Sequence, residues 1–227
     1  MKKFFIPTVC IFACLVASGC ASFGKKAQKS SSPAAAPKPV EFYYEQGNTF
    51  YDQGAYSEAL ESYNEAIVIN PNYAELYNNR GVAYDETENY DQAIADYSRA
   101  IQLKADYAQA YNNRGNAYAG LGNYDLAIAD YNRAITISPN NAFAYNNRGA
   151  SYLKIGEFDR AIADYTRALA LNPDYTSAYF NRGAAYKLQG NYQKAMDDWD
   201  TVLSHNPSHE RALENREAAR TLLQGRR

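Results

Sequence analysis

The stretch YNNRGNAYAGLGNYDLAIADYNRAI, residues 111–135, indicates the architecture of this protein, because similar stretches stand on both sides of it. YNNRGVAYDETENYDQAIADYSRAI occupies residues 77–101, and YNNRGASYLKIGEFDRAIADYTRAL occupies residues 145–169, at equal distances along the chain. Weaker copies follow further outward, so a fixed period predicts a stack of similar supersecondary units. The five units are residues 40–73, 74–107, 108–141, 142–175 and 176–209.

Each unit carries the pattern of two helices joined by a turn. Two stretches of about 13 residues have apolar positions at helical spacing, and a turn such as Leu121-Gly122-Asn123 separates them. The fold expected from this pattern is all-α. Proline, which cannot continue a helix, closes four of the units, at Pro71, Pro139, Pro173 and Pro207.

One glycine recurs in the first helix of every unit, although glycine within a helix costs about 1 kcal/mol relative to alanine. Its recurrence predicts close approach of the two helices, with an alanine of the second helix opposite. Large aromatic residues fill the remaining core positions, so most of the 22 tyrosines are assigned to the core rather than to base stacking. The glycines are Gly47, Gly81, Gly115, Gly149 and Gly183. The alanines are Ala59, Ala93, Ala127, Ala161 and Ala195.

This pattern resembles the tetratricopeptide repeat, and the resemblance extends over residues 40–209 without an insertion. It implies a right-handed α-solenoid of five helix-turn-helix units. Residues 210–227 begin like a sixth first helix and then lose the pattern, because Arg220 stands where an aromatic residue is expected. We expect them to form a capping helix that covers the last apolar face of the solenoid.

An arginine precedes the recurring glycine in four units, where the family commonly has leucine. Each of these units has an aspartate sixteen residues later, whereas the first unit has Gln46 and Ser62 at the two positions. This co-occurrence predicts an ion pair between the two helices of a unit; a row of ligand-binding arginines is the alternative. The pairs are Arg80 with Asp96, Arg114 with Asp130, Arg148 with Asp164 and Arg182 with Asp198.

In the family, the first helices line a concave face that holds extended or helical peptide segments. Carried over by position, the candidate partner-binding groove comprises Asn78, Asn79, Asn112, Asn113, Asn116, Phe143, Asn146, Asn147, Lys154, Phe180, Asn181 and Lys187. Within it, one asparagine from each of units two to five forms a row of amides that can both donate and accept hydrogen bonds. Such a row either binds a peptide backbone or bridges neighbouring units, and the sequence leaves both interpretations open. The row is Asn79, Asn113, Asn147 and Asn181.

The charge of the predicted groove changes from acidic in the first two units to apolar and basic in the last two. We therefore expect the acidic or C-terminal end of a partner segment, with a bulky apolar side chain, near Phe143, Lys154, Phe180 and Lys187. A chance gradient of surface charge is the alternative. The lysines and arginine by which some family members grip chaperone tails have no counterpart here, because asparagines stand at those positions.

The first residues have the layout of an export signal. Lys2-Lys3 precedes an apolar run, residues 4–16, that is too short for a comfortable membrane span, and Ala17-Ser18-Gly19-Cys20 follows. This ending resembles a bacterial lipobox, which implies a signal peptide at 1–19 and acylation of Cys20, for instance with palmitate. The alternatives are an ordinary cleaved signal and acylation at Cys14.

Residues 20–39 are small, polar and broken by proline, which is typical of a flexible tether between a lipid and a folded domain. Ala21 follows the candidate acylated cysteine, where an aspartate would favour the inner membrane in this class of lipoprotein. We therefore expect an anchor in the outer membrane, with the helical units facing the periplasm.

Residues 1–39 hold six lysines and no acid, so residues 40–227 hold 17 Lys plus Arg against 25 Asp plus Glu. An acidic domain repels phosphate, which argues against nucleic acid as a partner. No cysteine follows Cys20, and Pro207 separates the only histidines, His205 and His209, which are expected in an exposed turn. No catalytic residue, metal site or cofactor is assigned.

The function expected is that of an envelope-anchored scaffold, not an enzyme, which binds protein or peptide segments in its concave groove. The alternative is a structural subunit of an envelope assembly, such as a pilus or secretion-pore assembly lipoprotein. Such a subunit would use permanent repeat interfaces and would self-associate.

Overall fold

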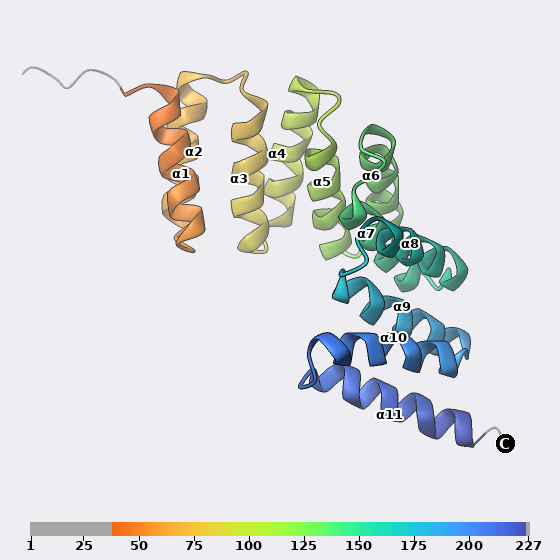
Figure 1. Ribbon diagram of the computed structural model, residues 1–227. Coiled ribbons are helices and arrows are strands. Elements are labelled where there is room, and N and C mark those ends of the chain that lie inside the picture. Colours follow the sequence, from red (N-terminus) through yellow and green to blue (C-terminus); the bar gives the residue numbers. More distant parts are fainter. Residues whose placement is uncertain (1–37, 226–227) are drawn as a thin grey trace, which may run out of the picture. The chain divides into compact units, whose positions relative to one another are not determined.

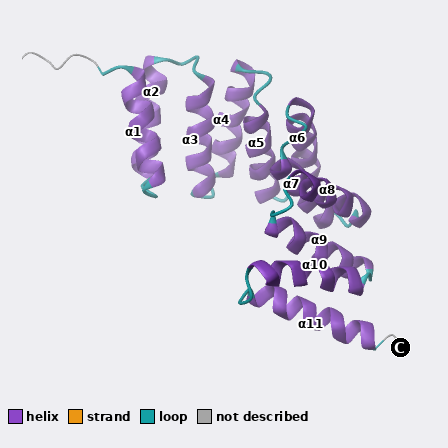
Figure 2. Cartoon of the chain, in the orientation of Figure 1, coloured by secondary structure: helices purple, strands orange, loops and turns teal. Residues whose placement is uncertain are grey.

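The computed structural model describes residues 38–225, which fold into eleven α-helices and no strand (Figures 1 and 2). The segment that begins at Lys38 is a compact unit of its own. The predicted signal peptide, Cys20 and most of the tether lie outside the described residues. The helices are α1 (Val40–Asp52), α2 (Tyr56–Ile69), α3 (Ala74–Glu86), α4 (Tyr90–Leu103), α5 (Ala108–Gly120), α6 (Tyr124–Ile137), α7 (Ala142–Lys154), α8 (Phe158–Leu171), α9 (Thr176–Gln189), α10 (Tyr192–His205) and α11 (Glu210–Gln224).

The helices pack in consecutive pairs, and each pair falls within one repeat unit. α1 packs on α2, α3 on α4, and so on to α9 on α10, while the second helix of each pair also contacts the first helix of the next. Figure 1 shows this succession from the orange α1 to the blue α11. The predicted all-α repeat array is therefore confirmed. None of the described helices is long and apolar enough to span a bilayer.

The first helices form one side of the array. α1 contacts α3, α3 contacts α5, and the series continues through α7 and α9 to α11. Within the described residues, no two of the second helices, α2 to α10, contact each other. The units are therefore closest together on the side of the odd-numbered helices, and we call that side the inner face.

Aromatic rings from the second helices fill the centre of each unit. Tyr131 of α6 is buried, and a Cβ atom added to Gly115 of α5 would lie 2.7 Å from a carbon of its ring. The recurring glycine thus makes room for an aromatic ring of the second helix, and in the last unit the backbone oxygen of the predicted Ala195 also lies 3.2 Å from the Cβ position of Gly183. Trp199 takes the same place beside Gly183 in the last unit.

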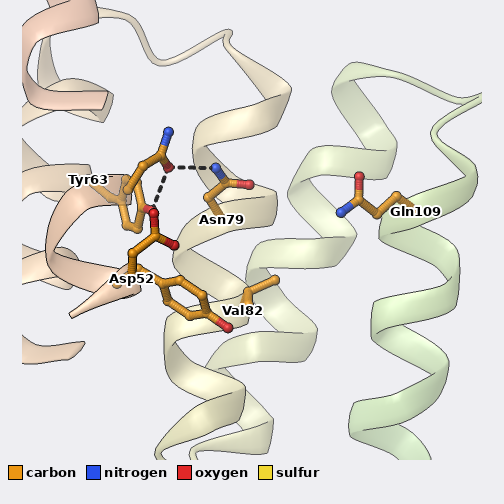
Figure 3. Close-up of a pocket in the computed structure, with 7 residues that line it drawn as sticks. Asp52, Tyr63, Asn79, Val82 and Gln109 are labelled. Atoms are coloured by element: carbon orange, nitrogen blue, oxygen red, sulfur yellow. Dashed lines mark hydrogen bonds between the residues drawn. The ribbon is translucent and has the colours of Figure 1, made fainter. Parts of the chain in front are cut away.

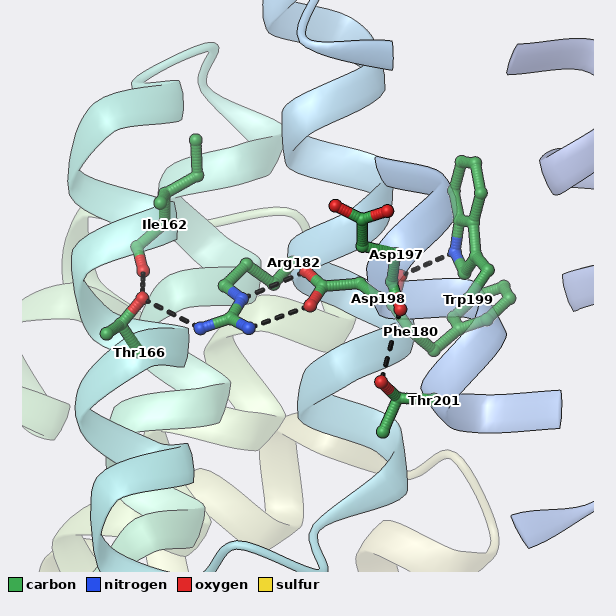
Figure 4. Close-up of polar contacts among 8 residues, drawn as sticks. All are labelled: Ile162, Thr166, Phe180, Arg182, Asp197, Asp198, Trp199 and Thr201. Atoms are coloured by element: carbon green, nitrogen blue, oxygen red, sulfur yellow. Dashed lines mark hydrogen bonds and ion pairs between the residues drawn. The ribbon is translucent and has the colours of Figure 1, made fainter. Parts of the chain in front are cut away.

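The predicted Arg–Asp ion pairs form in all four units. Arg182 Nε donates to Asp198 Oδ2 at 2.9 Å, and Nη2 donates to Oδ1 at 2.7 Å (Figure 4). Nη1 donates to Thr166 Oγ1 of the preceding unit at 3.2 Å. Each arginine therefore joins three helices from two units, which favours the structural interpretation over a ligand-binding row. The same two-bond geometry joins Arg80 to Asp96, Arg114 to Asp130 and Arg148 to Asp164.

α11 covers the end of the last complete unit, as predicted for a capping helix. Its buried Ala219 belongs to one hydrophobic cluster with Trp199 and Val202 of α10. Arg216 occupies the repeat position of the paired arginines and forms an ion pair with Asp200, with Nε and Oδ1 2.5 Å apart. The cap is thus a sixth first helix without a second helix after it in the described chain.

Candidate functional site

The inner face is built on a chain of hydrogen bonds between side-chain amides. Asn48 Oδ1 of α1 accepts from Tyr63 OH at 2.8 Å and from Asn79 Nδ2 of α3 at 3.0 Å. Asn79 Oδ1 accepts from Asn78 Nδ2 at 3.2 Å, and Asn78 Oδ1 accepts from Asn113 Nδ2 of α5 at 3.2 Å. One continuous chain of amides therefore joins the first three units.

The same chain recurs two units further along. Asn116 Oδ1 accepts from Tyr131 OH at 2.8 Å and from Asn147 Nδ2 at 3.0 Å. Asn147 Oδ1 accepts from Asn146 Nδ2 at 3.2 Å, and Asn146 Oδ1 accepts from Asn181 Nδ2 at 3.2 Å. Each member lies two units after its counterpart, so the network has twice the period of the helices, which recur in every unit.

A single position of the first helix sets this two-unit period. It is asparagine in units one and three, but Val82 in unit two and Ala150 in unit four. The core tyrosines of units two and four, Tyr97 and Tyr165, therefore lack the amide acceptor, and their buried hydroxyls have no hydrogen-bond partner within residues 38–225. Units one and three are thus chemically distinct from units two and four.

Two predicted groove residues, Asn78 and Asn146, are buried, with 1% and 7% of their surface exposed. The prediction that they face a ligand is wrong, because each lies between neighbouring units as a link in its amide chain. The structure thus shows inter-unit bridging, one of the two interpretations of the amide row. The bridging residues, all half-buried, are Asn79, Asn113, Asn147 and Asn181.

A pocket of about 380 Å³ lies on the inner face and draws its lining from the first three units (Figure 3). Figure 3 shows Asp52 beside Tyr63, and Gln109 entering from α5. Burial, followed by a hydrogen bond of 3.1 Å to Glu86, raises the pKa of Tyr51 to about 12. We call this cavity the first pocket; its lining is Asn48, Tyr51, Asp52, Tyr63, Asn79, Val82 and Gln109.

A second pocket, of about 240 Å³, lies two units further along the inner face. Lys154, one of the predicted groove residues, is exposed at this pocket and takes part in none of the ion pairs of the described chain. The predicted Asn112, half-buried, accepts a long hydrogen bond of 3.5 Å from Asn147 Nδ2. The lining of the second pocket is Asn116, Ala119, Tyr124, Tyr131, Asn147, Ala150, Ser151 and Lys154.

The capping helix contacts the predicted groove residues of unit five. The Phe180 ring stacks on the imidazole of His209, with centroids 5.3 Å apart. Lys187 Nζ donates to Asn215 Oδ1 of α11 at 3.2 Å. Two of the side chains expected to meet a partner therefore already have partners within the chain, and the ligand-accessible groove is centred on units one to four.

The two histidines differ in their surroundings. His205 is exposed at the end of α10, as expected. His209, by contrast, is half-buried, and its Nδ1 accepts from the Ala212 backbone N–H at 3.2 Å, so it caps α11. The prediction of an exposed turn is wrong for His209, because capping and stacking fix its ring. No group of three or more His, Cys, Asp or Glu residues in the described part of the chain could hold a metal ion.

The inner face carries opposite charges at its two ends. In unit two, Asp85 Oδ1 is buried without a hydrogen-bond partner in the described chain, and burial, followed by the charge of Glu86, raises the pKa of Asp85 to about 6. In unit four, Phe143 is 59% exposed with Tyr175 against its ring, and Lys154 is exposed. The acidic and the apolar-basic ends predicted from the sequence thus both lie on first helices.

Models of the TPR repeat match residues 47–88 and 86–122, and models of the tetratricopeptide repeat match residues 108–141, 142–175 and 176–209. Together these matches cover most of the chain. It belongs to the tetratricopeptide-repeat family. The last three matched ranges coincide with the third, fourth and fifth units read from the sequence.

Solved structures share this fold. MamA is 26% identical over 73% of this chain and 90% of its own, with a TM-score of 0.65. YrrB is 22% identical over 77% and 90%, with a TM-score of 0.64. A tetratricopeptide-repeat protein from Parabacteroides merdae is 23% identical over 82% and 73%, with a TM-score of 0.70. A search of curated proteins gave no match.

The interpretation of this tetratricopeptide-repeat protein from sequence missed two kinds of site residue. Asn215 and Arg216 continue the amide and arginine rows into the cap, and their distance of one full repeat from Asn181 and Arg182 was the available signal. The hydroxyl of Tyr63 was assigned only to the core, yet it also lines a pocket. Periodicity carried no signal for that second role, because the same position serves the core in every unit.

Proposed function

We propose that this protein is an envelope-anchored scaffold that binds extended or helical segments of partner proteins on its inner face. The pair of pockets along units one to four carries the proposal, because both present side-chain amides on one continuous face. YrrB, which shares the fold, is described as having an unusual peptide-binding site. A few polar groups held in place at a pocket are the features that orient a bound ligand.

Affinity capture from envelope extract tests the binding function, with residues 38–227 as bait. The groove variant changes Asp52, Gln109, Phe143 and Lys154 to alanine, none of which belongs to an amide chain. We expect a partner to be retained by the wild type and lost by the folded groove variant. Capture of the same proteins by both would place binding outside the inner face. A matched control changes Val68 and Leu126, exposed on the second helices, to alanine.

The anchor proposed for this scaffold is a lipid on Cys20 that inserts into the outer membrane, with the helices facing the periplasm. The sequence pattern that ends at Cys20 supports it. Labelling of the full chain with radioactive palmitate, followed by fractionation, tests it. We expect Cys20→Ser to abolish the label and release the protein from the membrane fraction. If Cys20→Ser kept the label and stayed in the membrane fraction, while Cys14→Ser lost the label and left that fraction, the anchor would be at Cys14.

A structural subunit of an envelope assembly is the second candidate, and exposed apolar residues on the second helices favour it. Val68 of α2 is 81% exposed, and Leu126 of α6 is also exposed. Sedimentation velocity of residues 38–227 over a range of concentrations tests this candidate. Self-association that is lost in Val68→Ser with Leu126→Ser would support permanent interfaces, and a monomer at all concentrations would contradict them.

A further inference from the structure

The two pockets of the inner face are one site that the chain builds twice, at an interval of two units. The first is built on Asn48, Tyr63 and Asn79, and the second on their counterparts Asn116, Tyr131 and Asn147. In both, the tyrosine hydroxyl donates to the first asparagine at 2.8 Å, and the other asparagine donates to it at 3.0 Å. A ligand therefore meets the same pair of half-buried amides twice, each pair held by a buried tyrosine.

The rims of the two pockets differ in charge. Asp52 lines the first pocket, and Glu86 is held nearby by the hydrogen bond from Tyr51. Two units later, Gly120 stands at the position equivalent to Asp52, and Lys154 stands at the position equivalent to Glu86. The second rim therefore has no acid at the first position and a base at the second. No basic residue lines the first pocket, and no acidic residue lines the second.

Glu86 thus has a partner in Tyr51, whereas the other two charged rim residues form no ion pair within residues 38–225. Neither Asp52 nor Lys154 belongs to an ion pair of the described chain, whereas Lys187 is engaged by Asn215. Charges at the edge of a partly enclosed site attract opposite charges more strongly than charges in bulk water. Each pocket thus offers matching hydrogen-bonding groups beside an unpaired charge of opposite sign.

We propose that the two pockets bind one extended segment of a partner protein, with a lysine or arginine at the first pocket and a carboxylate at the second. This inference rests on the proposed binding function of the inner face and adds the chemistry of the segment. The matched amide groups supply hydrogen bonds to either part of the segment. The rims then select its direction, because the reversed segment would bring like charges together.

The spacing of the two charged residues in the segment follows from the helix packing. The first helices of successive units contact one another, and contacting helices have axes about 10 Å apart. Pockets two units apart are therefore separated by roughly 20 Å. An extended chain advances about 3.3 Å per residue, so the basic and acidic residues of the segment stand about six residues apart.

A peptide array tests this inference directly with residues 38–227. The probes are twelve-residue Ser/Thr/Ala peptides that carry one lysine and one glutamate, in both orders and at every separation. We expect one order to be retained, with an optimum near six residues, and its Kd to rise at least tenfold in either Asp52→Lys or Lys154→Glu. The double variant Asp52→Lys with Lys154→Glu should prefer the opposite order.

A charge-matched control carries Glu65→Lys with Lys194→Glu, at exposed positions on α2 and α10, and should keep the wild-type order. Circular dichroism of every variant confirms that the helices are intact. Retention of peptides without regard to charge order, unchanged in the double variant, would overturn this inference while the proposed binding function stands. Retention of no peptide, together with capture of the same proteins by the groove variant, would overturn both.

Discussion

The Arg–Asp pairs of units two to five differ from ordinary surface ion pairs because both partners are largely buried and share two hydrogen bonds. In Arg114 and Asp130 the nitrogen–oxygen distances are 2.7 and 2.8 Å, and the hydrogen bonds to Asp130 raise the pKa of Arg114. Unit one shows what the neutral alternative is like, since Ser62 Oγ donates to Gln46 Oε1 at 3.4 Å in the same place. The chain thus contains its own control for these ion pairs.

Removal of one member of such a pair should cost more than replacement of both. Arg114→Gln leaves the largely buried carboxylate of Asp130 unpaired, and we expect it to lower the free energy of unfolding by about 3 kcal/mol. The double variant Arg114→Gln with Asp130→Ser recreates the neutral pair of unit one and should recover at least about 1 kcal/mol of that loss. Urea unfolding measures both. A double variant no more stable than Arg114→Gln would contradict the ion-pair interpretation.

Asp85 should make stability depend on pH in the sense opposite to a paired carboxylate. Its pKa in the folded protein is about 6, above the ordinary value of 3.8, so the folded state binds the proton more tightly than the unfolded state. Its unfavourable contribution is therefore absent below the unfolded pKa, grows as the pH rises through 6, and persists above it. Asp85→Asn should stabilise the protein at pH 8 by on the order of 1 kcal/mol after solvent screening.

Urea unfolding of Asp85→Asn and wild type between pH 4 and pH 8 checks this prediction. The difference between their free energies of unfolding should shrink toward pH 4. Asp125, exposed in the first turn of α6, provides the matched control. Asp125→Asn reports the effect of the same substitution at a carboxylate in solvent. If the free energies of unfolding of Asp85→Asn and wild type differed by the same amount at every pH, the pKa of Asp85 would not be raised by folding, and the prediction would be wrong.

At the scale of the element, the turn inside each unit is the same in shape but not in sequence. Four of the turns place a glycine at positive φ, at Gly54, Gly122, Gly156 and Gly190. The turn of unit two places Glu88 there instead, with φ of 58°. An L-residue in this left-handed region costs about 1–2 kcal/mol, so the turn between α3 and α4 is strained where its equivalents are not.

Glu88→Gly should therefore stabilise the protein. Part of the relieved strain is offset because glycine gains more freedom in the unfolded chain, which leaves a net gain of about 0.5–1 kcal/mol in the free energy of unfolding. The converse change, Gly122→Glu, should destabilise by a similar or larger amount. Thermal unfolding of both variants measures the effect. A loss of stability in Glu88→Gly would mean that the glutamate makes a favourable contact that outweighs the strain.

At the scale of the whole array, the cap decides whether the last apolar face meets water. Ala219 of α11 is buried against the cluster of Trp199 and Val202, whereas its neighbour Ala218 is exposed. These adjacent alanines allow one substitution to be compared on two sides of the same helix. An aspartate at 219 would bring an unpaired carboxylate into this cluster, which is costly, while the same residue at 218 stays in solvent.

We expect Ala219→Asp to release α11, lower the unfolding midpoint in urea and cause self-association through the exposed face. Ala218→Asp should change the free energy of unfolding by no more than about 0.5 kcal/mol. Trp199 is the only tryptophan of the chain, so its fluorescence reports on this end of the array. Equal effects of the two substitutions would show that α11 is not held by the packing of Ala219.

The repeat, the pairing of helices and the Arg–Asp bridges could all be predicted from the amino-acid sequence. Each of these depends on residues that recur at a constant interval, and equivalent residues in a stack of equal units have equivalent neighbours. The chain could be divided into helices from the period of the repeat, because that period survives even where single residues vary.

Which polar groups remain accessible to a ligand could not be predicted without the packing of the helices. Asn78 and Asn79 are neighbours in sequence, yet one is buried and the other faces the first pocket, because their hydrogen bonds run to different units. Phe180 and Lys187 matched the groove pattern, but the capping helix reaches both. The doubled period of the pockets depends on which side chain of one unit meets which side chain of the next, and a hydrogen bond requires the right group at both ends.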